Sequence, residues 1–174
     1  RGFEVQGHTF ESVLDLHTFD PARYADLVAR AEASGVRFLS LADVGNTEAW
    51  QRRLYEVNYR GVLDDPASDG TGWISFDEFR RNFETAAWFR PEGQIMAVVG
   101  ADRVVGITAV GYYEERNSMS QWMTAVDPDF RGQGIAQALK VVVLRWAKAY
   151  GADSVRTRND ANNTAMLAMN RKLG

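Results

Sequence analysis

The chain has 174 residues, of which 45% are hydrophobic and 25% are charged, and its formal net charge is −3. These values suit one globular domain with an ordinary core, and the interspersed charges form no basic block of the kind that binds nucleic acid. The sequence has no cysteine, which excludes a disulfide framework, a thiolate zinc site and a cysteine nucleophile. Because no apolar run reaches the length of a membrane span and the chain opens without a signal peptide pattern, a cytoplasmic protein with no membrane partner is expected.

In the first half of the chain, alternation of polar and apolar side chains predicts strands, and a period of 3.6 with capping residues predicts helices. The predicted elements are, in chain order, a strand over 9–16, a helix over 20–34, a strand over 36–41, a helix from Asn46 or Thr47, a loop over 63–72 and a helix that begins with the capping box Ser75–Glu78. The loop is rich in Asp, Gly, Ser and Pro, and its acids Asp64, Asp65 and Asp69 favour a cationic partner.

The second half changes from strands in succession to strands alternating with helices. The predicted elements are strands over 95–99, 104–113 and 118–126, a helix over 135–150, a strand over 154–157 and a helix over 163–173. This order predicts an α+β fold with a mixed, mostly antiparallel central sheet and helices on both faces. The strand–helix–strand unit within it is expected to be a parallel crossover.

The segment from Val126 to Ala136 lies between a predicted strand and a strongly periodic helix. Helix starts carry free backbone N–H groups and attract phosphate, and Gly132 and Gly134 let the backbone approach an anion closely. A Walker loop would need Gly-Lys-Ser/Thr after its glycines, and a Rossmann fingerprint would need a third glycine in an early strand–helix unit. The remaining alternatives are a pyrophosphate loop of another kind and a glycine-rich turn that caps an ordinary helix.

Arg131-Gly132-Gln133-Gly134-Ile135-Ala136 resembles the [Arg/Gln]-x-x-Gly-x-[Gly/Ala] signature of the GNAT superfamily of N-acetyltransferases. The strand end Val126-x-Pro128-x-x-Arg131 and the closing helix, from Asn162-Asn163 to Lys172-Leu173-Gly174, match the family as well. In order and spacing the resemblance covers residues 36–174. It implies a GNAT acetyltransferase domain over 36–174 that lacks the family's usual final strands, preceded by a strand and linker helix over 1–35.

The resemblance also implies a cofactor and a reaction. Acetyl-CoA would bind with its pyrophosphate on the loop amides and its pantetheine arm along the preceding strand end. A primary amine of a small molecule or peptide would attack the thioester directly, which requires proximity and an oxyanion donor. The cofactor-binding residues expected from the resemblance are Thr124, Ala125, Val126, Arg131, Gly132, Gln133, Gly134, Ile135, Ala136, Asn159, Asn163 and Asn170. The two histidines, His8 and His17, lack ligand partners at metal spacing, so no metal is expected.

Two departures from the family pattern concern catalysis. Asn170 occupies the position where many relatives carry a tyrosine that acts as the acid toward the CoA sulfur, and an amide can donate a hydrogen bond but not a proton. The strand 118–126 carries no glutamate to act as base, which leaves Glu114 and Glu115 as the nearest acids. Asn170 and Glu114 are therefore the catalytic candidates, with a water-mediated base as the alternative to Glu114. The departures also favour a second hypothesis, a non-catalytic acyl-CoA-binding module or the degenerate half of a tandem acetyltransferase.

The start of the chain resembles the segment that comes after the closing helix in this family. Residues 1–16 resemble the terminal strands of a preceding GNAT-like copy, with 20–34 as the linker between copies. Such a strand would pair with an open sheet edge of this domain, of a tandem partner or of a second copy in a homodimer. The alternative is an ordinary N-terminal extension.

Overall fold

The computed structural model describes residues 9–64, 72–161 and 163–173. The strands are β1 (Thr9–Asp15), β2 (Arg37–Ser40), β3 (Gln94–Val99), β4 (Arg103–Tyr113), β5 (Ser118–Val126) and β6 (Ser154–Asp160). The helices are α1 (Ala25–Ala33), α2 (Glu48–Leu63), α3 (Phe76–Thr85), α4 (Ile135–Tyr150) and α5 (Thr164–Leu173). Short 3₁₀ turns cover Pro21–Tyr24, Pro91–Gly93, Glu114–Arg116 and Pro128–Phe130.

The strands form one sheet in the order β1-β6-β5-β4-β3-β2. The pair β5–β6 is parallel and the other neighbouring pairs are antiparallel. The helix α4 connects the two parallel strands, as expected for a crossover. The predicted α+β fold with a mixed, mostly antiparallel sheet is confirmed.

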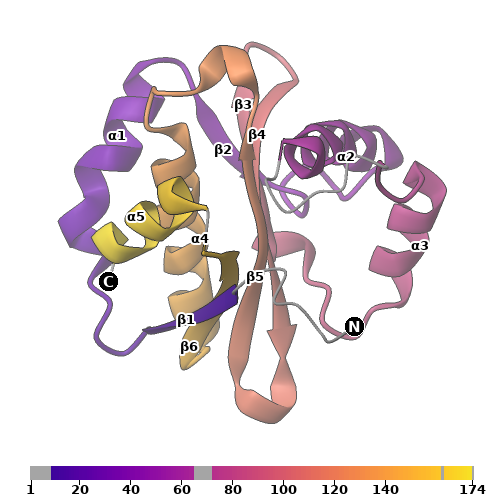
Figure 1. The fold of residues 1–174 in the computed structure, drawn as a ribbon. Helices are drawn as coiled ribbons and strands as arrows, with labels where there is room; N and C mark the ends of the chain where they lie inside the picture. Colours follow the sequence, from indigo (N-terminus) through magenta and orange to yellow (C-terminus); the bar gives the residue numbers. More distant parts are fainter. Residues whose placement is uncertain (1–8, 65–71, 162, 174) are drawn as a thin grey trace, which may run out of the picture.

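Helices cover the two faces of the sheet unequally. The helices α1, α4 and α5 lie on one face, and α2 and α3 lie on the other (Figure 1). The first face is built around α4, whose Leu139 and Val143 pack with Val155 of β6. On the second face, Leu54 of α2 and Phe79 of α3 pack against Ile107 of β4. The helices α2 and α3 therefore form a layer separate from the one that holds α4.

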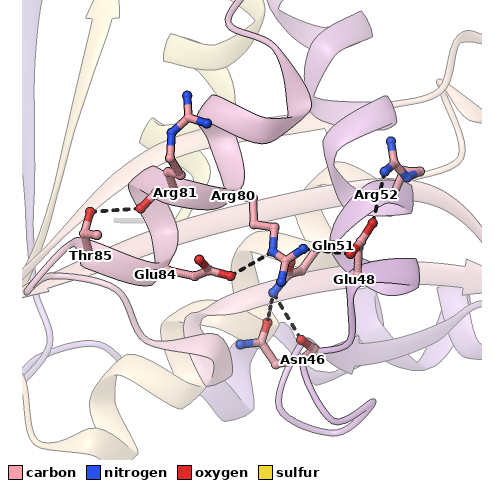
Figure 2. Close-up of polar contacts among 8 residues, drawn as sticks. All are labelled: Asn46, Glu48, Gln51, Arg52, Arg80, Arg81, Glu84 and Thr85. Atoms are coloured by element: carbon pink, nitrogen blue, oxygen red, sulfur yellow. Dashed lines mark hydrogen bonds and ion pairs between the residues drawn. The ribbon is translucent and has the colours of Figure 1, made fainter.

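The helix α3 is attached to α2 by charge as well as by apolar packing. Arg80 of α3 contacts Glu48 of α2 at 2.7 Å and Glu84 of its own helix at 2.8 Å (Figure 2). The capping box of Ser75 and Glu78 is formed as predicted. Because exposed ion pairs contribute little each, burial of the α3 phenylalanines is the main attachment of this helix.

The structure differs from the sequence prediction at two places. The strand β6 runs to Asp160 rather than Thr157, because β1 pairs with it antiparallel along its whole length. The segment predicted as one helix over 20–34 opens with a 3₁₀ turn, in which the Asp20 carboxylate accepts from the Ala22 amide at 2.9 Å. Most of the predicted loop 63–72 lies outside the described residues.

The N-terminal strand is paired, as the tandem hypothesis requires, and its sheet edge partner is this chain's own β6. The hypothesis that residues 1–16 derive from a preceding copy stays a prediction. Within the described ranges, no helix is long and apolar enough to cross a membrane. In the same ranges, no cluster of His, Asp and Glu side chains is placed to hold a metal ion.

Candidate functional site

The parallel strands β5 and β6 separate halfway along their length. They pair from Ser118–Ser154 to Gln121–Thr157, and beyond this point each strand continues without pairing to the other. Backbone N–H and C=O groups that face such a gap need other partners. The gap is therefore a place where an extended ligand can hydrogen-bond to the strand edges.

A β-bulge lies at the point of separation. Ala109 of β4 pairs with Met123 and Val110 pairs with Gln121, so Trp122 is the extra residue on β5. A bulge leaves the extra residue out of the ladder and re-aims the side chains beside it. Trp122 is 57% exposed and lies 5.8 Å from the ring of Trp88.

The glycine-rich loop forms the start of α4, at the end of β5. Gly132 and Gly134 have φ angles of 76° and 79°, and the space where a side chain would begin is open at both. Gly134 is the N-cap of α4, with no side-chain cap and no acidic residue in the first turn. The first-turn amides are thus left to water or to an anion, which is the arrangement predicted from the sequence.

Charged side chains around the loop hold its shape. Arg131 donates to the Val126 carbonyl oxygen at 3.0 Å and forms an ion pair with Asp64 just beyond α2. The buried carboxylate of Asp127 accepts from the Asp129 amide at 3.1 Å and from Arg60 at 3.2 Å. Asp64, one of the three acids that favoured a cationic partner, is therefore paired within the fold, and Asp65 and Asp69 lie outside the described residues.

A polar network crosses the apolar layer between α4 and the sheet. The Lys140 ammonium donates to the Gln121 side-chain oxygen at 2.8 Å and to the Asn170 side-chain oxygen at 2.7 Å. Gln121 in turn donates to the hydroxyls of Thr108 at 2.8 Å and Thr124 at 3.1 Å. Lys140 is 3% exposed, and burial lowers its pKa from the usual 10.5 to about 8.

Two pockets meet at the point where β5 and β6 separate. A cavity of about 50 Å³ lies on the α4 side and is lined by Lys140, Asn170, Gln121 and Thr157 among others. A pocket of about 250 Å³ is lined by side chains that include Trp122, and it shares Gln121 and Thr157 with the first. Side chains alternate along a strand. Arg156 and Arg158, which line the larger pocket, therefore project to the face opposite Thr157, so the two pockets open on opposite faces.

The charged residues of the larger pocket are mostly basic. It is lined by Glu11, Tyr113, Arg116, Ser120, Gln121, Trp122, Arg156, Thr157 and Arg158. Glu11 pairs with Arg156 at 2.9 Å, whereas the Arg116 guanidinium lies over the Tyr113 ring at 5.2 Å. Burial raises the pKa of Tyr113, so its hydroxyl stays protonated at neutral pH.

The structure brings part of the predicted site together. Asn170 lines the small cavity, and Thr124 joins the polar network beside it. Asn159 is buried on β6, and the side-chain nitrogens of Asn159 and Asn170 are buried without a hydrogen-bond partner in the described part of the chain. Asn163 caps α5, since its side-chain oxygen accepts from the Met166 amide at 3.1 Å.

Other predicted residues lie elsewhere or act through the backbone. Ala125 is buried against α2, and Gln133 contacts the Asp129 carbonyl oxygen at 3.5 Å. Ile135 is buried beneath the start of α4, with Ala136 after it in the first turn. Glu114 is exposed in the turn before β5, at the opposite end of that strand from the loop.

Lys140 is not among the site residues predicted from the sequence. The signal was present, because Lys140 interrupts the apolar run from Ala138 to Leu144 in a helix with an otherwise ordinary apolar face. Thr157, which forms the shared wall of the two pockets with Gln121, carries no such signal, because polar residues are common on strands.

Comparisons with known proteins agree with this fold. The acetyltransferase (GNAT) family model matches residues 59–174. The chain therefore belongs to the acetyltransferase (GNAT) family. The mycothiol acetyltransferase of Saccharopolyspora erythraea is 29% identical over 120 residues, which make up 69% of this chain and 38% of the relative. The matched part thus spans about two fifths of that relative.

Solved structures show the same fold at low sequence identity. A tandem GNAT protein from the clavulanic acid biosynthesis pathway matches with a TM-score of 0.67 and 22% identity, over 97% of this chain and 49% of that one. The NatC complex bound to Gag peptide and CoA matches with a TM-score of 0.63 and 19% identity, over 80% of this chain and 83% of that one.

Proposed function

We propose that this chain transfers an acetyl group from acetyl-CoA to a primary amine by direct attack of the amine on the thioester. One observation carries the proposal. The gap between β5 and β6 leads from the glycine-rich start of α4 to two pockets that share Gln121 and Thr157. A donor and an acceptor that enter from opposite faces would meet at this shared wall. The names of the matched proteins support the same chemistry.

The chain offers a partner for each part of the cofactor. The amides of Gly132 to Ala136 would hold the pyrophosphate at the uncapped helix start. The unpaired edge of β5 from Thr124 to Val126 would hydrogen-bond the pantetheine arm. The Asn159 side-chain nitrogen, buried and without a partner in the described residues, would donate to an amide oxygen of that arm.

The reacting groups would meet near the bulge at Trp122. The amide of this extra residue is the donor we assign to the thioester carbonyl oxygen, where negative charge develops during attack. The acceptor amine would enter through the larger pocket and arrive in its neutral form. Tyr113 is a hydrogen-bond donor there and not a base, because its pKa is raised. Water is the route we assign to the proton that the amine releases.

The acceptor class follows from the charges of that pocket. The guanidinium groups of Arg116, Arg156 and Arg158 outnumber the one carboxylate, Glu11, among the residues that line it. Arginine forms directional, charge-assisted hydrogen bonds with carboxylates and phosphates. We therefore propose a primary amine that also carries an acidic group, which revises the cationic partner favoured by the acids of the loop 63–72.

Acetyl-CoA binding to the parent and to Gly134→Trp, measured by calorimetry, tests the loop assignment. An indole at this position would occupy the anion site, so affinity should fall by at least about tenfold. Gly151→Trp is a matched control, because Gly151 caps the other end of α4 with a φ of 94° and equally open space. The control should bind as the parent does. A parent that folds but does not bind acetyl-CoA would refute the proposed function.

Turnover is then monitored as release of the CoA thiol with a panel of amines. Transfer to any amine of the panel supports the enzyme. Binding of acetyl-CoA without transfer or hydrolysis supports the second hypothesis, an acyl-CoA-binding module.

A further inference from the structure

A buried ammonium group lines the small cavity, and among the described residues no carboxylate pairs with it. Lys140 is 3% exposed, and both of its hydrogen-bond acceptors are neutral amide oxygens, those of Gln121 and Asn170. Burying a charge without an opposite charge is unfavourable, and the group responds by becoming more acidic. A methionine would fill the same volume without this penalty, so the charge points to a role beyond packing.

The position of Lys140 along α4 places it on the path of the cofactor. It lies five residues after the first residue of α4, a rise of about 8 Å along the helix axis. An extended pantetheine arm that begins at the helix start and runs along the gap between β5 and β6 is longer than this rise. It would therefore carry the thioester sulfur to the small cavity, whose lining includes Lys140, Asn170 and Gln121.

We propose that Lys140 stabilises the departing CoA thiolate and gives it a proton, with Asn170 as the residue that positions the ammonium. This inference rests on the proposed function. The amine nitrogen forms a bond to the carbonyl carbon, and the C–S bond breaks with its electron pair on sulfur. The Lys140 ammonium transfers one proton to that sulfur and becomes a neutral amine. It regains a proton from the one that the acceptor amine releases to water.

The surroundings of Lys140 suit this proton transfer. Its acidity, near that of a thiol with a pKa of about 8.5, makes the transfer close to balanced, whereas an ordinary lysine would hold its proton more tightly. The cavity is also lined from β1 by Ser12 to Leu14, from β6 by Val155 and Thr157, and from α4 and α5 by Leu144 and Leu173. No titratable side chain is among these residues or the two amide partners, so no neighbouring titration in the described cavity wall competes with that of Lys140.

The assignment also accounts for Asn170 at the position where a tyrosine would be the expected acid. The Asn170 oxygen accepts from Lys140, which fixes one of the three ammonium protons, and Gln121 fixes a second. The third proton is then left for a group in the cavity. The amide supplies orientation, and the lysine supplies the proton that an amide lacks.

The pKa of the CoA thiol bound to the chain tests the inference and needs no acceptor. It is measured through the NMR chemical shift of the methylene next to sulfur in isotopically labelled CoA. A cation beside the sulfur lowers the thiol pKa, so the parent should hold it at least about one unit below that of free CoA. Lys140→Met should remove this difference. Lys148→Met is the matched control, because Lys148 lies on the same helix and donates to the Phe19 carbonyl oxygen.

The outcomes separate this inference from the proposed function. A bound thiol pKa equal to that of free CoA in the parent overturns the role of Lys140 and leaves cofactor binding intact. So does an equal shift in the parent and Lys140→Met. Failure of the parent to bind CoA overturns both. If Lys140→Met does not fold, the parent alone still tests the inference, because a bound thiol pKa equal to that of free CoA overturns it.

Discussion

Burial of the Lys140 ammonium destabilises the folded chain at neutral pH. Its pKa is about 8 in the folded chain and near 10.5 without burial. A difference of this size corresponds to roughly 3 kcal/mol. The unfolded chain binds more protons between these two values, so stability rises as the pH rises from about 8 toward 10.5. Below pH 8 both states are protonated and the penalty is complete.

Lys140→Met should remove this rise of stability with pH. The free energy of unfolding in urea, measured for both chains at pH 7 and pH 10, should favour the variant by more at pH 7 than at pH 10. The absolute gain at pH 7 is smaller than the burial penalty, because Gln121 and Asn170 each lose a hydrogen-bond donor at a cost of about 1–3 kcal/mol. Equal differences between the two chains at both pH values would show that burial does not lower the pKa of Lys140.

At the residue scale, the glycine-rich loop before α4 was predicted better from the sequence than the polar network around Lys140. Gly132 and Gly134 were predictable because a chain reversal at a helix start requires their backbone freedom, and both have positive φ. Lys140 was not singled out, because helical periodicity places it near the apolar face but does not reveal which residues of other strands it meets. Those partners, Gln121 and Asn170, are brought to it by tertiary packing.

At the scale of elements, the contact of α2 with β5 depends on a residue without a side chain. A Cβ atom on Gly61 would lie 2.5 Å from the Cβ of Ala125. Helix propensity alone predicts that Gly61→Ala stabilises α2 by up to about 1 kcal/mol. The overlap predicts the opposite, a loss of about 1–3 kcal/mol, because two backbones would have to move apart.

Thermal unfolding of Gly61→Ala decides between the two effects. We expect a lower melting temperature than the parent. A higher one would mean that α2 does not pack on β5 as closely as described. Since Ala125 lies in the predicted cofactor strand, the variant should also weaken acetyl-CoA binding more than its effect on folding alone would.

The bounds of β5 and α4 were predicted correctly, because each has a strong period and a clear end signal: the loop between them and Gly151 after α4. The predicted end of β6 was wrong. Pairing with β1 keeps the last residues of β6 extended, and the strand signal of β1 lies far away in the sequence. Local pattern thus predicted the elements of the site, and pairing between distant strands set the depth of the gap beside β6.

At the scale of the whole molecule, the sheet would separate the two halves of the proposed reaction. The helices α4 and α5 enclose the small cavity on one face, and the larger pocket lies on the face that also carries α2 and α3. This arrangement keeps the buried Lys140 ammonium away from the arginines of the larger pocket. One positive charge would act on the leaving sulfur, and the others would act on the acceptor.

The charge of the larger pocket predicts selectivity among acceptors of the same shape. Glutamate should be acetylated with a higher kcat/KM than glutamine, by about tenfold, because the two differ in one carboxylate that arginine can bind. Arg116→Met should reduce this ratio, since Arg116 is the pocket arginine that makes no ion pair with Glu11 in the described structure. Arg30→Met, an exposed change on α1, should leave the ratio as it is. Equal use of both amines by the parent would show that the arginines do not recognise the acceptor, while acetyl transfer itself would stand. A ratio that persists in Arg116→Met would place the recognition on Arg156 and Arg158, whose pairing with Glu11 the acceptor would then have to replace.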